Sequence, residues 1–190
     1  MAVQKILLYP QEKTALRTKS ETIPISDRRT IRLIRDLKDT LLAHPDGIGL
    51  AAPQIGVHLR VLIVRLGAKY DWDDQATPPI ALINPEIVAA DKPRKDYDGC
   101  LSFPGLFGTT TRPHYLRISG LDERGEPLEK VYKGFDAVLV HHEIDHLEGV
   151  LFIDHIESPN DLYRMTLDAS GKPVRELMSE FTSMVISDLD

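Results

Sequence analysis

The stretch from Phe135 to Glu148 constrains the fold most, because its apolar residues recur at helical spacing and two histidines continue their stripe. The members of the stripe are Phe135, Val138, Leu139, His142 and His146. Since the two histidines are four residues apart, a helix would place their rings on one face, about one turn apart. The sequence therefore predicts a helix that directs two imidazoles toward the protein interior.

The composition limits what else the chain can be. Its 190 residues fit a single domain, residues 1–190, and its 42% hydrophobic and 27% charged residues are typical of a globular protein. A formal charge of −6 argues against tight, non-specific nucleic-acid binding, and we expect no direct readout of nucleic acid. The N-terminus lacks a basic segment followed by a long apolar core, so we predict a cytoplasmic protein without membrane attachment.

The remaining pattern predicts an α+β fold. A first helix is expected over residues 26–44, with Ser26 as its N-cap and an apolar stripe of Ile31, Ile34, Leu37 and Leu41. Strands are expected at 60–66, 79–84, 115–121 and 128–133, with a turn at 122–126 between the last two. A further helix is expected after Pro173, with Leu177, Phe181 and Met184 on one side. We expect small antiparallel sheets packed around the central helix of residues 135–148.

The sequence His142-Glu143-Ile144-Asp145-His146 is the first candidate for chemistry. Neutral imidazoles bind divalent transition metals, and a carboxylate one residue after the first ligand can take a proton from a metal-bound water. The alternative is that the two histidines are polar residues on a solvated helix face, which would give the same sequence pattern. The metal reading is favoured, because both histidines continue an apolar stripe in which unpaired imidazoles would be unfavourable.

A third protein ligand is needed for a catalytic metal. One metalloprotease pattern requires a histidine where this chain has Phe152, and His155 comes three residues too late. Another would recruit Glu176 or Glu180, neither of which has a local signature. The single cysteine, Cys100, is the better candidate, because a thiolate is a soft, anionic ligand, although an isolated cysteine is more often a small buried hydrophobe.

Three segments together resemble the peptide deformylase family. The first, residues 47–54, is rich in small residues and ends with Gln54; the others are 99–102, around Cys100, and 142–149. They resemble the three signature motifs of that family in order and separation, and the resemblance extends from about Ile6 to Ile156. Two positions depart from the family pattern, where Asp98 replaces a Glu and His141 replaces a Gln.

The resemblance implies a metal-dependent hydrolase that removes the N-formyl group from the formyl-methionine of new polypeptides. Cys100, His142 and His146 would then hold the metal, with Fe²⁺ as the working ion and Zn²⁺, Ni²⁺ or Co²⁺ also suited to the ligands. Glu143 would move the proton. The side-chain amide of Gln54 and, by resemblance, the backbone N–H of Leu101 would stabilise the oxyanion.

Substrate binding and partners follow from the same resemblance. In the family, the segment around Ile48 and Gly49 pairs with the substrate backbone. The methionine side chain needs an apolar pocket, and we expect Phe135, Val138 and Leu139 to form it, because they precede His142 on its own helix face. Some deformylases associate transiently with ribosomes through a basic C-terminal helix, but this C-terminal segment is acidic, so we expect it to pack on the domain. A metallopeptidase and a catalytically silent binding module of the same fold remain as alternatives.

Overall fold

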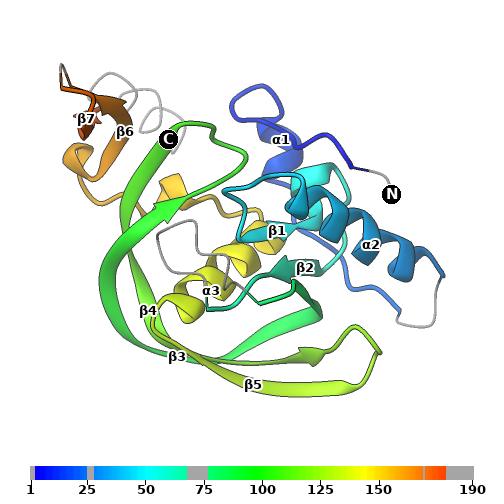
Figure 1. The fold of residues 1–190 in the computed structure, drawn as a ribbon. Coiled ribbons are helices and arrows are strands. Elements are labelled where there is room, and N and C mark those ends of the chain that lie inside the picture. The colour runs from blue at the N-terminus through cyan, green and yellow to red at the C-terminus, as the bar shows by residue number, and fades with distance from the viewer. Residues whose placement is uncertain (1–2, 25–27, 68–76, 169, 179–190) are drawn as a thin grey trace.

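The computed structural model describes residues 3–24, 28–67, 77–168 and 170–178. Its main feature is a curled antiparallel sheet that wraps around one helix, α3 (Phe135–Glu148), as Figure 1 shows. The strands are β1 (Gly49–Ala51), β2 (Val61–Val64), β3 (Ile80–Gly99), β4 (Leu106–Leu121), β5 (Pro127–Lys133), β6 (Leu162–Leu167) and β7 (Pro173–Leu177). Their order is β1-β2-β3-β4-β6-β7, and β5 pairs with β4.

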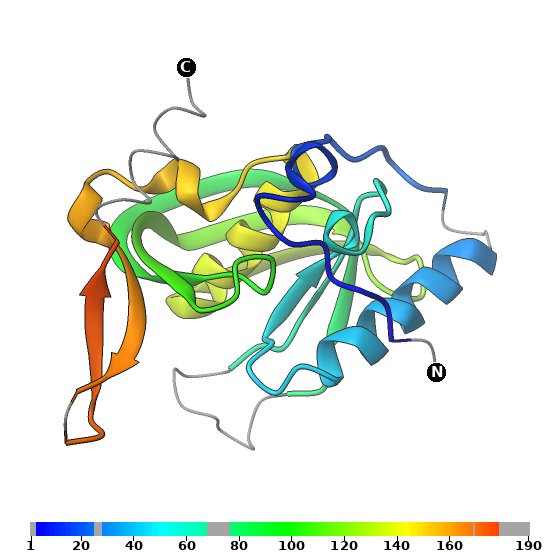
Figure 2. The same ribbon diagram turned by 90° about the horizontal axis from the view of Figure 1, so that it is seen from above.

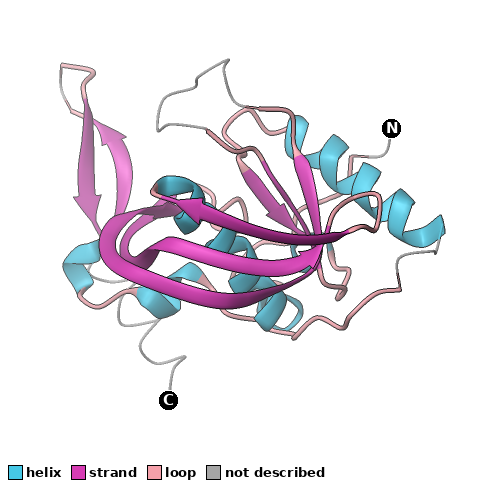
Figure 3. Cartoon of the chain, turned by 90° about the horizontal axis from the view of Figure 1, so that it is seen from below, coloured by secondary structure: helices cyan, strands magenta, loops and turns pink. Residues whose placement is uncertain are grey.

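The two long strands β3 and β4 form the frame of the sheet. They pair from Ile83–Leu121 to Gly99–Phe107, and two register shifts near Glu86 and Ala89 interrupt the ladder. Such irregularities bend a strand and increase its twist, which suits the curl seen in Figure 3. β4 then pairs with β5 along its second half and with β6 at its beginning. The end of β3, which leads into Cys100, therefore lies close to α3.

Helix α3 has the bounds that the sequence predicts, and most of its residues are buried. Its Leu139, Val140, Ile144 and Leu147 pack into a core cluster with residues of β1, β2 and β4. The helix ends at Gly149, whose φ of 75° favours glycine and whose Cβ, if present, would lie 2.2 Å from the backbone oxygen of Arg17. The sheet and the N-terminal segment thus enclose the helix.

The first predicted helix is present as α2 (Arg28–Leu42), whereas its expected N-cap, Ser26, lies outside the described residues. Leu33, Ile34, Leu37 and Leu41 are its buried apolar residues. The inclusion of Ile31 in the apolar stripe was wrong, because its side chain is 59% exposed. The remaining helices are α1 (Lys13–Leu16) and the 3₁₀ helices η1 (Ala52–Ile55), η2 (Phe152–His155) and η3 (Pro159–Asp161).

Two further expectations need correction. The segment after Pro173 is not helical up to Leu177 but forms strand β7, which pairs with β6 in a hairpin that projects from the body (Figure 2). Phe181 and Met184 lie outside the described residues. The described strands also join into one sheet rather than several small ones. No described helix is long and apolar enough to span a membrane.

Candidate metal centre

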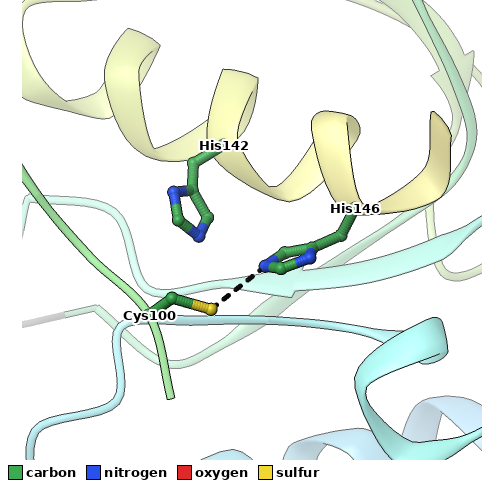
Figure 4. A group of neighbouring side chains, drawn as sticks. All are labelled: Cys100, His142 and His146. Carbon is green, nitrogen blue, oxygen red and sulfur yellow. Dashed lines mark hydrogen bonds between the residues drawn. The ribbon is translucent and has the colours of Figure 1, made fainter. Parts of the chain in front are cut away.

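Cys100, His142 and His146 converge on one point, as the sequence predicts. Cys100 follows the last residue of β3, and the histidines lie one turn apart on α3 (Figure 4). The three potential ligand atoms lie within 4.8 Å of one another, and Cys100 Sγ is 3.3 Å from His146 Nε2. One thiolate and two imidazoles form a donor set that suits a divalent transition metal. The residues present therefore fit the implied metal.

A carboxylate orients the first histidine. Nδ1 of His142 lies 2.7 Å from Oδ1 of Asp98, which leaves Nε2 of the ring for a metal. Burial lowers the pKa of His142, but Asp98 and Cys100 outweigh it and raise the pKa well above its usual value. Burial and the neighbouring His142 lower the pKa of His146 well below its usual value, which favours the neutral imidazole that a metal requires.

Asp98 is in turn held by a buried arginine. Nε of Arg112 donates to Oδ2 of Asp98 at 2.6 Å, and the hydroxyl of Thr110 donates to the same oxygen at 2.8 Å. Nη1 of Arg112 also donates to Asp145 at 2.6 Å, so one guanidinium joins β3, β4 and α3. Burial raises the pKa of Asp98, yet His142 and Arg112 hold it well below its usual value. Asp98 is therefore a carboxylate.

The two departures from the family pattern both touch this network. Asp98 contacts the potential ligand His142 directly, and Nδ1 of His141 lies 2.7 Å from Nη1 of Arg112. His155 adds a contact of 2.8 Å between its Nε2 and Asp145. Sequence reasoning noticed Asp98 and His141 only as departures and missed Arg112 altogether. No local signal marks Arg112, because its role depends on strand pairing and on helix packing at the same time.

Glu143 lies buried beside the backbone of β1. A Cβ placed on Gly49 would come within 2.2 Å of Glu143 Oε1, so only glycine leaves room for the carboxylate in its present position. Glu143 is 3% exposed, and its Oε2 forms no hydrogen bond within the described part of the chain. Burial raises the pKa of Glu143 to about 7, although His142 opposes the shift. A carboxyl group with that pKa can both accept and return a proton near neutral pH.

The side chain of Gln54 extends from η1 toward Cys100. Its Oε1 accepts a hydrogen bond of 2.8 Å from the backbone N–H of Ala51, which fixes the orientation of the amide. Its Nε2 then points toward Ser102 Oγ, at 3.2 Å, and Cys100 Sγ, at 3.4 Å. Leu101 directly follows Cys100, and its side chain packs against the core cluster of α2 and β1. An amide donor is thus held beside the three potential ligands.

Comparison with known proteins decides what this centre belongs to. Residues 3–161 match the family model described as polypeptide deformylase. Peptide deformylase 1 of Bacillus subtilis (strain 168) is 40% identical over 156 residues, which cover 82% of this chain and 91% of that protein. The chain belongs to the polypeptide deformylase family. As a deformylase it is a metal-dependent hydrolase that removes the formyl group from an N-terminal formylmethionine.

Solved deformylases share the fold. The enzyme from Legionella pneumophila has a TM-score of 0.72 and 31% identity, and the match covers 99% of this chain and 95% of that one. The enzyme from Synechococcus elongatus, in complex with actinonin, has a TM-score of 0.73 and 32% identity, with 83% and 81% of the two chains covered. A deformylase from Acinetobacter baumannii with Met-Ala-Ser bound has a TM-score of 0.74 and 28% identity, with 82% and 99% covered.

The residues expected to contact substrate in this deformylase lie in two places. Gly49 is the first residue of β1, the end strand of the sheet path, and Ile48 directly precedes it. Ile48 packs against the core cluster that contains Leu139, whereas Val138 is buried and Phe135, the first residue of α3, is only half-buried. The described structure thus places Ile48 and Leu139 at the same core cluster and Phe135 at the beginning of the helix.

Proposed function

We propose that Cys100, His142 and His146 hold one divalent metal in this deformylase, with Fe²⁺ as the working ion. Zn²⁺, Ni²⁺ and Co²⁺ suit the same donors, because thiolate and imidazole bind all of these ions. When bound, the metal lowers the pKa of water and polarises the formyl carbonyl. The convergence of the three donor atoms within 4.8 Å is the observation that carries the proposal.

Glu143 is the proton carrier of the proposed mechanism. It takes a proton from the water that attacks the formyl carbon and delivers it to the amine nitrogen as the C–N bond breaks, so formate and a free N-terminus result. Its support is the buried carboxylate, whose Oε2 has no hydrogen-bond partner among described residues and whose pKa is raised to about 7. Packing against Gly49 keeps the carboxylate in place.

Gln54 and Leu101 stabilise the negative charge that develops on the formyl oxygen. The Gln54 amide is already oriented by Ala51, so its Nε2 can donate to the oxyanion in place of its long contact with Cys100 Sγ. The backbone N–H of Leu101 is the second proposed donor, next to Cys100 in the chain. Preorganised donors of this kind contribute roughly 10²–10³ in kcat in other hydrolases.

The substrate is proposed to bind as an added strand on β1. Backbone groups of Ile48 and Gly49 would pair with the formylated peptide, and the methionine side chain would pack against Phe135, Val138 and Leu139. The position of β1 at the end of the sheet path and the packing of Ile48 near Leu139 support this arrangement. The Acinetobacter baumannii relative with Met-Ala-Ser bound offers a comparable ligand that begins with methionine.

A single assay separates the proposed reaction from its alternatives. The metal-loaded protein is incubated with formyl-Met-Ala-Ser and, separately, with unformylated Met-Ala-Ser, while formate and new amines are measured. We expect formate from the first peptide and no cleavage of the second. Cleavage of internal bonds would indicate a metallopeptidase, and no reaction with either peptide would indicate a silent binding module.

The cellular setting follows from the substrate. We infer that residues 1–190 act as one catalytic domain on new polypeptides in the cytoplasm, where formylated chains are made, and that contact with ribosomes is transient. Support for the single domain is the sheet path that connects β1 near the beginning of the chain with β7 near its end. No step in the proposed reaction requires a membrane or a direct readout of nucleic-acid sequence.

A further inference from the structure

Helix α2 concentrates positive charge on the surface of an acidic protein. It contains five basic and two acidic residues, whereas the whole chain has a formal charge of −6. Arg28, Arg29, Arg32 and Arg35 all fall in its first eight residues, and all four are exposed. Figures 1 and 2 show α2 on the outside of the molecule, next to β1.

Three of these arginines share one face of the helix. Arg28, Arg32 and Arg35 are spaced by four and three residues, so they form a row about 10 Å long at a rise of 1.5 Å per residue. We call this row the α2 basic face. The opposite side of the helix contributes Leu33, Ile34, Leu37 and Leu41 to the core. The row therefore points away from the body of the protein.

The charges of the α2 basic face are largely uncompensated. The Arg32 side chain is 82% exposed, and its guanidinium is 3.8 Å from Asp36, a separation at which an exposed pair contributes little. Within the residues that the structure describes, Arg28 and Arg35 form no ion pair. Three positive charges are thus available to a partner.

Helix stability does not account for this arrangement. The positive end of the helix dipole lies at the N-terminus, where acidic side chains stabilise and basic ones destabilise. The first turn of α2 contains Arg28 and Arg29 and no acidic residue. Exposed residues that destabilise the helix they belong to often have a binding role.

We propose that the α2 basic face binds the phosphate backbone of RNA, without reading its bases. Guanidinium groups match phosphate oxygens in bidentate geometry, and four of the five cations on α2 are arginines. A lipid surface fits less well, because the apolar face of α2 is buried in the core and only Ile31 and Leu42, the last residue of α2, are exposed among its large apolar residues.

The choice of RNA as the polyanion rests on the proposed function, since new polypeptides emerge from an RNA-rich particle. The chain passes from the end of α2 through residues 43–48 directly into β1, the proposed strand for substrate. Binding through the α2 basic face would therefore hold the substrate-binding edge near the source of substrate. Phosphate contacts alone give salt-sensitive, reversible binding, which suits a transient association.

The test compares two triple variants with equal changes in charge. One carries Arg28→Gln, Arg32→Gln and Arg35→Gln; the control carries Arg94→Gln, Arg124→Gln and Lys133→Gln, three exposed residues on β3, in the β4–β5 turn and on β5. Binding of each metal-loaded protein to a fluorescent RNA hairpin is measured by anisotropy between about 50 and 200 mM salt. We expect the first variant to bind at least about tenfold more weakly and its salt slope to fall by roughly 2 to 3, at about 0.7–0.9 per phosphate contact. The control should bind like the unchanged protein.

Two further measurements distinguish RNA binding from binding to a lipid surface. An Ile31→Ser variant should keep its RNA affinity, and vesicles containing phosphatidylglycerol should bind no more tightly than the RNA. Equal RNA affinity of the two triple variants, a large loss with Ile31→Ser, or stronger binding to vesicles would each overturn the proposal. Formate release from a short formylated peptide should be unchanged in the α2 variant. Because RNA binding is read directly, a failure of deformylation would count against the proposed function and not against the basic face.

Discussion

At the scale of single residues, the position of Glu143 points most directly to a chemical role. Its carboxylate is buried beside two potential metal ligands, yet Oε2 has no hydrogen-bond partner among described residues. A purely structural carboxylate in such a place would be expected to be paired, because burying an unpaired polar group is unfavourable. The arrangement is instead suited to a group that exchanges its proton during a reaction.

Replacement of Glu143 by Gln tests this role. The amide keeps the size of the side chain but cannot accept a proton, so we expect metal content to stay the same while kcat falls by roughly two to four orders of magnitude. Metal is measured by elemental analysis and turnover by formate release. Near-normal turnover in a metal-loaded Glu143→Gln protein would refute the assignment.

Gly49→Ala tests the position of the same carboxylate. The new methyl group would lie 2.2 Å from Oε1 and 2.9 Å from Cγ of Glu143. Because the three nearest atoms all belong to the Glu143 side chain and none to the backbone, the fold should survive while that side chain is displaced. Because misplacement by about 1 Å can reduce rates about 10²-fold, we expect a loss of that order with little change in Tm. Gly171→Ala is the control for steric contact, since no atom lies near its Cβ, although its positive φ adds a backbone strain that Gly49→Ala lacks. Equal losses of activity in both variants would contradict the explanation.

The sequence predicted the potential metal ligands better than the residues that hold them in position. Cys100, His142 and His146 could be found because two lie at helical spacing and the third is the only cysteine, and the structure brings all three together. Arg112 could not be found, since its partners Asp98 and Asp145 come from elements that are distant in sequence. Long-range pairing leaves no local pattern for residues of this kind.

At the scale of elements, the centre depends on the junction between β3 and α3. Asp98, the next-to-last residue of β3, is the acceptor for His142 and the partner of Arg112. If it is lost, His142 is no longer oriented and a buried guanidinium loses one of its counter-charges. Removal of one partner of a buried ion pair typically costs about 3–5 kcal/mol.

Asp98→Asn should therefore weaken the metal site and the fold together. We expect metal affinity to fall by about 10–100-fold, the usual effect of losing a partner of a ligand, and Tm to drop. Asp98→Glu is the matched variant, because it restores the charge and has the residue that the family usually has. Retention of metal by Asp98→Glu, with loss in Asp98→Asn, would support the role of the carboxylate; equal metal affinity of Asn and Asp forms would exclude it.

The elements differed in how well the sequence predicted them. Helix α3 was predicted to its bounds, because its periodicity is uninterrupted and Gly149 ends it. Strand β3 was predicted only near its start, since residues 91–95 in its middle are all exposed and carry no alternation. The segment 173–177 was predicted as a helix but is a strand, because its pairing with β6 outweighs a short apolar spacing.

At the scale of the whole molecule, the positive surface charge lies on α2, whereas residues 171–178 contribute to stability. Residues 171–190 contain two basic and four acidic side chains, so this end offers nothing to a phosphate backbone. It does contribute to the fold, since β7 pairs with β6 and Met178 packs against the core cluster of Tyr9, Leu16 and Phe152.

Truncation after Ser170 should consequently lower stability without affecting association with ribosomes. Each kcal/mol lost lowers Tm by about 2–4 °C in a protein of this size, and we expect a drop of several degrees. Co-sedimentation with ribosomes should remain at the level of the full chain, whereas the α2 variant with three arginines replaced should lose it. A folded truncated protein that no longer co-sediments would show that the C-terminal end, and not α2, makes the contact.

The shortness of β1 has a consequence for self-association. A strand at the border of a sheet exposes unpaired backbone groups, which invite other chains to aggregate edge to edge. β1 has three residues, so any unrelated strand could form only a small number of backbone hydrogen bonds with it. Only a peptide that also anchors a side chain nearby would stay bound for long. A longer β1 would bind the proposed peptide substrate more tightly, but it would also present more unpaired backbone for edge-to-edge aggregation of the enzyme.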